Sequence, residues 1–449
     1  MRSSLRTSSA FVVLLTNLVG SVQSSLTTFG TQGVNLLRLP KSPSGGDVRL
    51  EVAAAAAPTF PQYNFTQPLD HFVDTGFTFN QRFWVSNRHY KPGGPVVVLD
   101  GGETDGEDRL PFLDTGIVDI LTSATNGLGV ILEHRYYGKS VPVENFTTDS
   151  LRCASALLFV FVNHALADSA NFMANVKFEG ISEDLTAPGT PWIYYGGSYA
   201  GARSAHMKVL YPELVFGAIA SSGVTFATLK DWQYFDIIRQ FAPSDCIQQI
   251  EDTIQTVDKY LTASNSTRDT IKSAFGMKNL TNDHDFASLL SSPLGNWQNN
   301  NWDPAVGSTG FANFCSALGS PSNNTQVKLS KDVTVSSAVL NYAAYMNRCF
   351  GTFDASSYQV YDLSQTWRLW DFQVCTQWGF FSTAPPDPKQ PRIVSKLLTL
   401  DYATLLCKFA YPPGEHFTVP ALPNITAVNS LGGLNIAGDR LAIIDGQGA

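Results

Sequence analysis

The chain has 449 residues, of which 44% are hydrophobic and 15% charged, and its formal net charge is −8. This length and composition describe a globular protein with a sizeable core, long enough for one large domain with an insertion or for two domains. The acidic balance, without any basic run, excludes nucleic acid as the expected partner.

The first two dozen residues have the pattern of a signal peptide. A basic start with Arg2 and Arg6 precedes an apolar stretch over residues 10–20, and small residues then offer a cleavage site. This apolar stretch is shorter than the roughly 20 residues that span a bilayer. We therefore predict a signal peptide at 1–24 rather than a membrane anchor, and a pro-segment or loose arm at 25–58.

Sequons and cysteines both point to the secretory pathway. Asn-x-Ser/Thr sequons, which predict N-glycosylation, occur at Asn64, Asn145, Asn265, Asn279, Asn323 and Asn424. Disulfides form in such oxidising compartments, and the six cysteines can pair in 15 ways. Five of them lie beyond Cys153, so we expect disulfides in the second half of the chain. No cysteine spacing resembles a zinc site, and we expect no cofactor.

Residues 59–225 alternate between strand and helix patterns, which predicts a mostly parallel sheet. Buried strands are expected at 96–99, 130–132, 192–195 and 215–220, with a helix around 151–176. The pattern then becomes helical over 226–415, for example at 246–261. We interpret this block as a helical cap inserted over the sheet edge. Residues 416–449 contain a strand and turn over 440–446 that return to the main sheet.

One stretch carries the chemistry. The strand at 192–195 runs into Gly196-Gly197-Ser198-Tyr199-Ala200-Gly201, and a helix pattern follows that ends before Pro212. A serine on such a turn is typical of the nucleophile elbow of an α/β-hydrolase. The turn lifts its Oγ above the sheet, and the next backbone N–H, that of Tyr199, lies beside the developing oxyanion. Strand before and helix after favour this interpretation over a glycine-rich turn with an incidental serine.

Two other strand ends carry polar residues. Asp100-Gly101-Gly102-Glu103 follows an early strand, and we predict that Gly101 and Gly102 supply the second oxyanion donor. An ordinary exit from the strand is the alternative. Glu133-His134-Arg135 ends the next strand, and we interpret this trio as a structural salt-bridge network.

The acid and base that assist the serine follow it along the chain in this fold. Three histidines come after Ser198. We interpret His206 as structural and His284 as a solvated helix start. His416, in the loop at the end of the insertion, is then the remaining candidate for the base, although a weak one. Asp445 ends the last strand, where the fold places its acid, but no histidine follows it. The triad therefore cannot be closed in the expected order.

Four motifs together resemble one peptidase family. They are the elbow, Glu-His-Arg-Tyr-Tyr-Gly-Lys-Ser at 133–140, Gln-Pro-Leu-Asp-His-Phe at 67–72 with Gln-Arg-Phe at 81–83, and Gln-Val-Cys-Thr-Gln-Trp-Gly-Phe-Phe at 373–381. The chain resembles the proline-specific serine peptidases that include lysosomal Pro-Xaa carboxypeptidase, dipeptidyl peptidase II and the fungal acid prolyl endopeptidases. This resemblance implies an α/β-hydrolase core with a helical cap, and Ser198 as the nucleophile. It also implies cleavage of proline-containing peptides or proteins at acidic pH, in a vacuole or lysosome or outside the cell.

The family continues its last strand as Asn/Asp-Gly-x-x-Asp-Pro-Trp, with a histidine some tens of residues later. Asp445-Gly446 matches the first two positions, and the acid position falls on Ala449. The resemblance therefore implies that the C-terminal end of the core is truncated, and we expect this chain to fold poorly alone. Three hypotheses stay open: a secreted proline-specific peptidase, a catalytically impaired homologue that at most binds peptides, or another α/β-hydrolase such as an esterase. The sequence distinguishes neither exopeptidase from endopeptidase action nor any oligomeric state.

Overall fold

The computed structural model describes residues 60–446, except for 152–159, 301–306 and 351–366. The predicted signal peptide and the segment at 25–58 lie outside the described residues. In the part of the chain that is described, no helix is both long and apolar enough to span a membrane.

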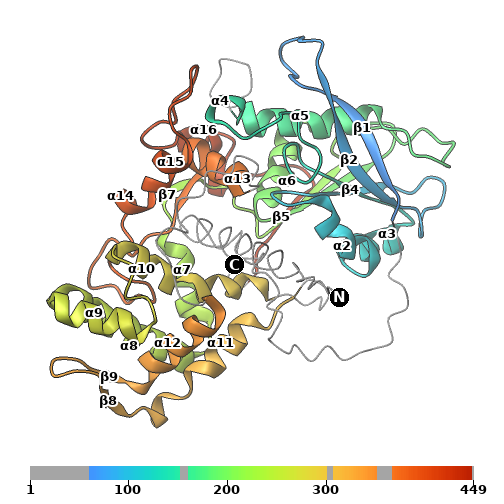
Figure 1. The fold of residues 1–449 in the computed structure, drawn as a ribbon. Helices are drawn as coiled ribbons and strands as arrows, with labels where there is room; N and C mark the ends of the chain where they lie inside the picture. Colours follow the sequence, from blue (N-terminus) through green and yellow to red (C-terminus); the bar gives the residue numbers. More distant parts are fainter. Residues whose placement is uncertain (1–59, 152–159, 301–306, 351–366, 447–449) are drawn as a thin grey trace, which may run out of the picture.

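The central sheet has seven strands in the spatial order β1-β2-β4-β3-β5-β6-β11 (Figure 1). They are β1 (Gln62–Pro68), β2 (Thr78–Ser86), β3 (Val96–Asp100), β4 (Leu128–Leu132), β5 (Trp192–Gly197), β6 (Gly217–Ser221) and β11 (Leu441–Ile444). The pairs β1–β2 and β2–β4 are antiparallel, whereas β4, β3, β5, β6 and β11 pair in parallel. The predicted strands are confirmed, including the last one, which pairs with β6.

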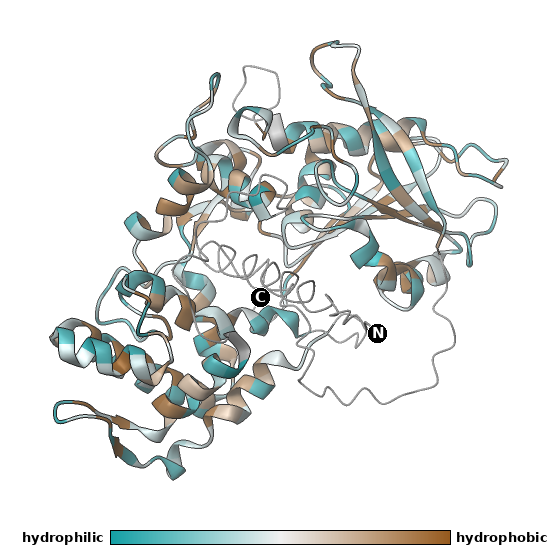
Figure 2. Ribbon diagram, viewed as in Figure 1, coloured by the Kyte–Doolittle hydropathy of each residue, from teal (hydrophilic) through white to brown (hydrophobic). Residues whose placement is uncertain are grey.

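Helices cover both faces of the sheet, and alternate residues of β3 show this directly. The helices are α2 (Leu110–Asp114), α3 (Ile117–Thr125), α5 (Val160–Asn175) and α6 (Tyr199–Leu210). Val97 and Leu99 pack in one cluster with α2 and α3, whereas Val96 and Val98 pack in another with α5 and α6. Because both faces are buried, β3 is apolar at four successive positions. Figure 2 shows the resulting hydrophobic strands at the centre of the sheet. The architecture is the α/β-hydrolase fold.

The block predicted as a helical insertion packs around two different cores. The first group of helices forms a hydrophobic core of its own at one side of the sheet (Figure 1). It comprises α7 (Trp232–Phe241), α8 (Ser244–Ala263), α9 (Asn265–Ala274), α10 (Asp283–Leu290), α11 (Gly310–Leu318) and α12 (Ser337–Phe350). The later group packs on the core of the sheet instead. It comprises α13 (Trp367–Gln373), a π-helical turn (Val374–Trp378), α14 (Leu400–Ala403) and α15 (Leu405–Ala410).

Short connections join these parts. The three-residue strand β10 (Gly379–Phe381) pairs in parallel with β7 (Thr228–Lys230), which follows the main sheet. One disulfide, Cys246–Cys315, joins α8 to α11, and another, Cys375–Cys407, joins the π-helical turn to α15. Both disulfides lie in the second half of the chain, as predicted. Cys153 lies outside the described residues.

Candidate active site

Ser198 stands on the turn between β5 and α6 with an unusual backbone. Its φ is 56° and its ψ −123°, a conformation that is costly for a residue other than glycine and that persists only where the surroundings enforce it. Its N–H donates to the Ser221 carbonyl of β6 at 3.0 Å, and its carbonyl accepts the N–H of Ala202 at 3.0 Å. The neighbouring strand and the helix therefore hold the turn from both sides. The Ser198 side chain is half-buried.

The small residues of the elbow allow the helix to approach the strand. A Cβ on Gly196 would stand 2.0 Å from the carbonyl oxygen of Ala200, and one on Gly201 would stand 2.8 Å from the Cα of Gly223. Neither position has room for a side chain. Ala200 replaces the usual last glycine of the motif, and it is buried without such a clash. The elbow geometry therefore tolerates alanine at this position.

The Asp100–Glu103 turn lies against this elbow, but the N–H groups of Gly101 and Gly102 are already engaged. A Cβ on Gly102 would lie 3.2 Å from the Cβ of Ala200, which places the turn at the start of α6. The Gly101 N–H donates to the Leu132 carbonyl at 2.8 Å, within the sheet. The Gly102 N–H donates to Asp100 Oδ1 at 2.9 Å. Either glycine would have to exchange this bond to serve as an oxyanion donor, so their role stays a prediction.

Glu103, the next residue, was not singled out from the sequence. Its side chain is buried, and its Oε2 has no hydrogen-bond partner among the described residues. Burial raises the pKa of this carboxyl, although the nearby charge of Arg109 opposes the rise. A neutral carboxylic acid carries one O–H donor. The available signal was an acidic residue placed directly after two glycines at the end of a fully apolar strand.

Tyr199 links the elbow to the later helices. Its hydroxyl lies 3.1 Å from His134 Nε2, and its ring packs against Trp370 and Trp378 at centroid distances of 5.2 and 5.6 Å. His134 Nδ1 lies 2.6 Å from the Arg135 carbonyl, so Nδ1 carries the proton and Nε2 accepts from Tyr199. Burial, with the Arg203 charge, lowers the pKa of His134 well below its usual range. The imidazole therefore remains an acceptor in mild acid.

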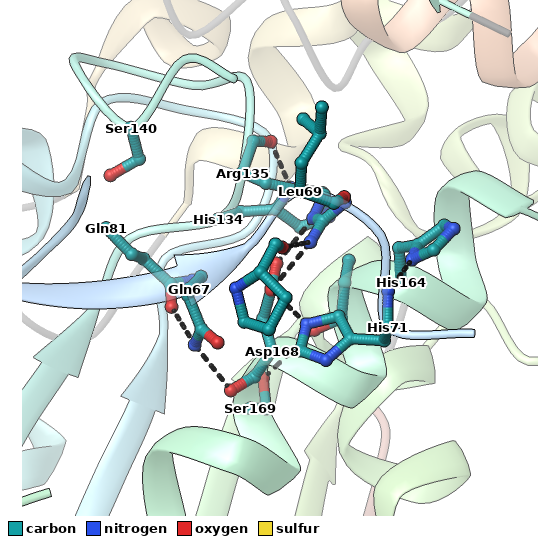
Figure 3. Close-up of polar contacts among 12 residues, drawn as sticks. Gln67, Leu69, His71, Gln81, His134, Arg135, Ser140, His164, Asp168 and Ser169 are labelled. Atoms are coloured by element: carbon teal, nitrogen blue, oxygen red, sulfur yellow. Dashed lines mark hydrogen bonds and ion pairs between the residues drawn. The ribbon is translucent and has the colours of Figure 1, made fainter. Parts of the chain in front are cut away.

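The charged residues around His134 form a buried network, in agreement with their structural interpretation. Glu133 accepts from Arg82 Nη2 at 2.6 Å and from the Ser140 hydroxyl at 2.6 Å. Arg135 donates two hydrogen bonds to Asp168 of α5, at 2.5 and 2.7 Å (Figure 3). Burying these charges is tolerable because each is paired and hydrogen-bonded.

The Gln-Pro-Leu-Asp-His-Phe motif joins the same network. Gln67 Nε2 donates to the Asp168 carbonyl at 2.8 Å, and His71 Nε2 lies 2.6 Å from Asp168 Oδ1 (Figure 3). The His71 N–H donates to His164 Nδ1 of α5 at 3.3 Å. Two motifs that are far apart in the sequence thus meet at Asp168.

The candidate bases do not reach the serine. His206 is buried in α6, its ring stacks on Trp378 at 6.2 Å, and burial lowers its pKa to about 4. His284 stacks on Tyr402 at 5.3 Å. The backbone N–H of His416 donates to Asp149 Oδ1 at 3.0 Å, in α4 (Thr148–Leu151). Across the described ranges, no histidine nitrogen lies within hydrogen-bond distance of Ser198 Oγ. Asp445 follows β11 and is exposed.

A half-buried serine on a strained strand-to-helix turn of a mostly parallel sheet has the position of the nucleophile elbow in an α/β-hydrolase, so its role as a nucleophile stays a prediction. The sequence comparison narrows this class. The chain belongs to the serine carboxypeptidase S28 family, whose model matches residues 67–447.

Curated relatives are similar along most of the chain. A probable extracellular serine carboxypeptidase of Arthroderma benhamiae is 39% identical over 430 residues, covering 86% of this chain and 58% of the relative. The serine protease vicPa of Bipolaris victoriae is 28% identical over 416 residues, covering 85% and 76%. The human lysosomal Pro-X carboxypeptidase is 32% identical over 208 residues, covering 45% and 37%. The chain thus spans little more than half the length of the first of these.

Solved structures resemble the chain only distantly. An acetylester hydrolase from Corynebacterium glutamicum covers 87% of this chain and is itself covered over 88%, with 13% identity and a TM-score of 0.32. The acetyl esterase MekB covers 88% of this chain and is covered over 90%, with 11% identity and a TM-score of 0.30.

Proposed function

We propose that this chain is a secreted or vacuolar serine peptidase that hydrolyses peptide bonds after proline through an acyl-enzyme at Ser198. The backbone of Ser198 is the observation that carries the proposal. Its strained φ and ψ are held by bonds to β6 and α6, and strain of this kind gathers at functional sites. Membership of the serine carboxypeptidase S28 family supplies the reaction class.

The first turn of α6 supplies one part of the chemistry. The Tyr199 N–H is the first of this helix, and first-turn N–H groups have no acceptor within their helix. It is therefore available to the oxyanion that forms when Ser198 Oγ attacks a carbonyl. A serine hydroxyl also needs a base, and the described residues place none at its Oγ.

We assign the second oxyanion donor to the neutral carboxyl of Glu103. Both glycine N–H groups of the preceding turn are engaged, whereas Glu103 Oε2 has no hydrogen-bond partner among the residues described. The raised pKa of Glu103 keeps its proton in place under acidic conditions. A peptidase with this donor would work best in acid, the condition that the family resemblance implies.

Specificity for proline is supported by the relatives and by the motifs. One relative is a Pro-X carboxypeptidase, and the Gln-Val-Cys-Thr-Gln-Trp-Gly-Phe-Phe motif contributes Trp378, whose ring packs on Tyr199 beside the nucleophile. Passage through the secretory pathway is supported by the six sequon asparagines, all of which are exposed. They are Asn64, Asn145, Asn265, Asn279, Asn323 and Asn424.

Hydrolysis assays test this proposal. Residues 25–449 are incubated at pH 5 with a proline-containing peptide set and, separately, with a short acyl ester, and products are identified by mass spectrometry. We expect cleavage after proline that disappears in Ser198→Ala. An ester preference without cleavage after proline would favour an esterase. Binding of the peptides without any cleavage would favour the impaired homologue.

A further inference from the structure

Asp100, the last residue of β3, joins the glycine turn to the elbow helix through a buried ion pair. Its Oδ1 accepts a hydrogen bond from Arg203 Nη1 of α6 at 2.9 Å, and the same oxygen accepts the Gly102 N–H at 2.9 Å. Its Oδ2 accepts from the Tyr194 hydroxyl of β5 at 2.6 Å. Asp100 is only 3% exposed and Arg203 only 2%. One carboxylate therefore connects the turn, the elbow strand and the elbow helix.

Arg203 is held at its other side by the neighbouring helix α5. Its Nη2 donates to the Ala165 carbonyl at 2.8 Å and to the Ser169 hydroxyl at 3.2 Å. The Ser169 hydroxyl also lies 2.8 Å from the Tyr194 hydroxyl, which closes a ring of hydrogen bonds that includes Asp100. Hydrogen bonds between charged groups are strong, and a buried network of this kind makes its members rigid. The ion pair is therefore fixed with respect to β5, α5 and α6.

The turn that Asp100 holds is in contact with the first turn of α6. Gly102 has a φ of 64°, and a Cβ on it would stand 3.2 Å from the Cβ and 3.9 Å from the backbone nitrogen of Ala200. Ala200 is the second residue after Ser198. A displacement of the turn is therefore a displacement relative to the elbow, and it also moves Glu103, to which we assign the second oxyanion donor. A misplacement of about 1 Å in an active site can slow a reaction about 100-fold.

We infer that Asp100 and Arg203 are positioning residues for the reaction at Ser198. The pair acts by fixing the glycine turn against the first turn of α6, and its action requires no contact with the substrate. This inference rests on the proposed function, because it needs Ser198 as the nucleophile. An ion pair that served stability alone would change the folded fraction of the protein but not the reaction rate of each folded molecule.

A second buried aspartate offers a matched control, in the separate core of the first group of helices. Asp258 of α8 accepts from Arg392 Nη2 at 3.1 Å and from the Lys396 N–H at 3.0 Å. The Ser395 hydroxyl also donates to it. Asp258 thus binds one arginine, one hydroxyl and one backbone N–H, as Asp100 does, and its exposed fraction is also 3%. Asp258→Asn should destabilise the chain as Asp100→Asn does, but should leave the reaction at the elbow unchanged.

Labelling of Ser198 by a fluorophosphonate in the full chain at pH 5 tests the inference. The limiting rate and the probe concentration that gives half of it are measured, and the rate is divided by the folded fraction that near-UV circular dichroism reports. We expect Asp100→Ala to lower the limiting rate about 100-fold. Asp100→Asn keeps an acceptor oxygen for the Gly102 N–H and should lower it less. The concentration for half the limiting rate should not change, because the pair positions the turn and does not bind the probe.

A double variant tests whether the two residues act as a unit. Asp100→Asn combined with Arg203→Gln should be no slower than the slower of the two single variants, since positioning is already lost when one partner is removed. If Asp100→Ala does not fold, the isosteric Asp100→Asn still provides the comparison with Asp258→Asn.

Three outcomes would overturn the inference. Equal labelling rates for Asp100→Asn and Asp258→Asn would show that the ion pair at the elbow serves stability alone. A faster reaction of Asp100→Asn would show that Asp100 withholds the Gly102 N–H instead of positioning the turn. Both outcomes would leave the proposed function intact, whereas a parent chain without a label on Ser198 would refute the proposed function and the inference together.

Discussion

At the scale of single residues, the site depends on elbow glycines that have no room for a side chain and on the Glu103 carboxyl of the neighbouring turn. Gly196 has no space for a Cβ because the Ala200 carbonyl lies 2.0 Å from that position, whereas Gly197 would place its Cβ 3.8 Å from the Ser221 carbonyl. Glu103 is the buried acid beside this elbow, and its protonation state depends on burial. Both features lead to measurable consequences.

The first prediction compares the two glycines of the elbow. Gly196→Ala should lower the free energy of unfolding by about 3 kcal/mol, because the added methyl group forces backbone atoms apart. Gly197→Ala is the matched control and should cost less than about 1 kcal/mol, since its methyl group meets only ordinary contacts. Urea denaturation followed by tryptophan fluorescence measures both. Equal costs for the two variants would contradict the close approach of α6 to β5.

The second prediction concerns Glu103. Its raised pKa means that the O–H donor is present in acid and is lost as the pH rises through that pKa. Cleavage after proline should therefore fall toward neutral pH in the parent chain. Glu103→Gln keeps an N–H donor that does not titrate, and its activity should fall less over the same range. Glu103→Ala should lose on the order of 100-fold in kcat at every pH, as expected for one oxyanion donor. If Glu103→Gln shows the unchanged pH profile of the parent, Glu103 is not the titrating donor.

At the scale of elements, the loop that follows β1 is held on α5 by a neutral histidine. His164 Nδ1 accepts the His71 N–H, which requires that this nitrogen is unprotonated. The groups that face His164 are Asp70, His71, Arg135 and Asp168. Burial, the largest cause, lowers the pKa of His164 to about 4. The unfolded chain binds a proton at His164 more readily, so acid favours unfolding.

The third prediction follows from the expected loss of stability in acid. Between the usual histidine pKa of about 6.5 and the folded value near 4, the free energy of unfolding should fall by about 2 kcal/mol as the pH is lowered. His164→Asn keeps an acceptor oxygen near the Nδ1 position without a titrating group, and its stability should fall less over this range. Urea unfolding at pH 7 and at pH 4.5 compares the two proteins. Equal losses of stability in the two proteins would show that the proton affinity of His164 does not differ between the folded and the unfolded chain.

Much of this element structure is predictable from sequence pattern, and the exceptions have physical reasons. The strand at 192–195 and the helix at 246–261 were predicted because their apolar residues follow a buried run or a 3.6-residue period. The packing of α13 on the sheet core was not predicted, since periodicity identifies an apolar face but not its partner. For the same reason, the sequence did not predict that two motifs meet at Asp168 or that the Gly101 N–H is hydrogen-bonded to Leu132. Both depend on contacts between distant segments.

At the scale of the whole molecule, two hydrophobic cores carry one disulfide each. Cys375–Cys407 ties the π-helical turn that ends at Trp378, whose ring packs on Tyr199. Cys246–Cys315 ties helices of the separate core. By loop length, the two bonds should contribute similar chain entropy to stability. Only Cys375–Cys407 lies in an element that packs on Tyr199, the residue after Ser198. Their removal should therefore separate global stability from the integrity of the site.

The fourth prediction uses this pair as mutual controls. Replacing either cysteine pair with alanine should lower the free energy of unfolding by about 4 kcal/mol, according to the chain-entropy relation for such loops. Loss of Cys375–Cys407 should also slow the reaction of Ser198 with a fluorophosphonate at temperatures where the protein remains folded. Loss of Cys246–Cys315 should leave that rate unchanged. Equal slowing in both variants would mean that the later helices do not support the elbow specifically.

The identity of the nucleophile is the central claim, and intact-mass spectrometry after treatment with a fluorophosphonate probe at pH 5 tests it most directly. We predict that residues 25–449 gain the mass of one probe group and that peptide mapping places it on Ser198. Ser198→Ala should gain none, whereas Ser222→Ala, at a neighbouring serine with φ 45°, should be labelled like the parent. An unlabelled parent chain, or a label mapped to another residue, would contradict the assignment of Ser198 as an activated nucleophile.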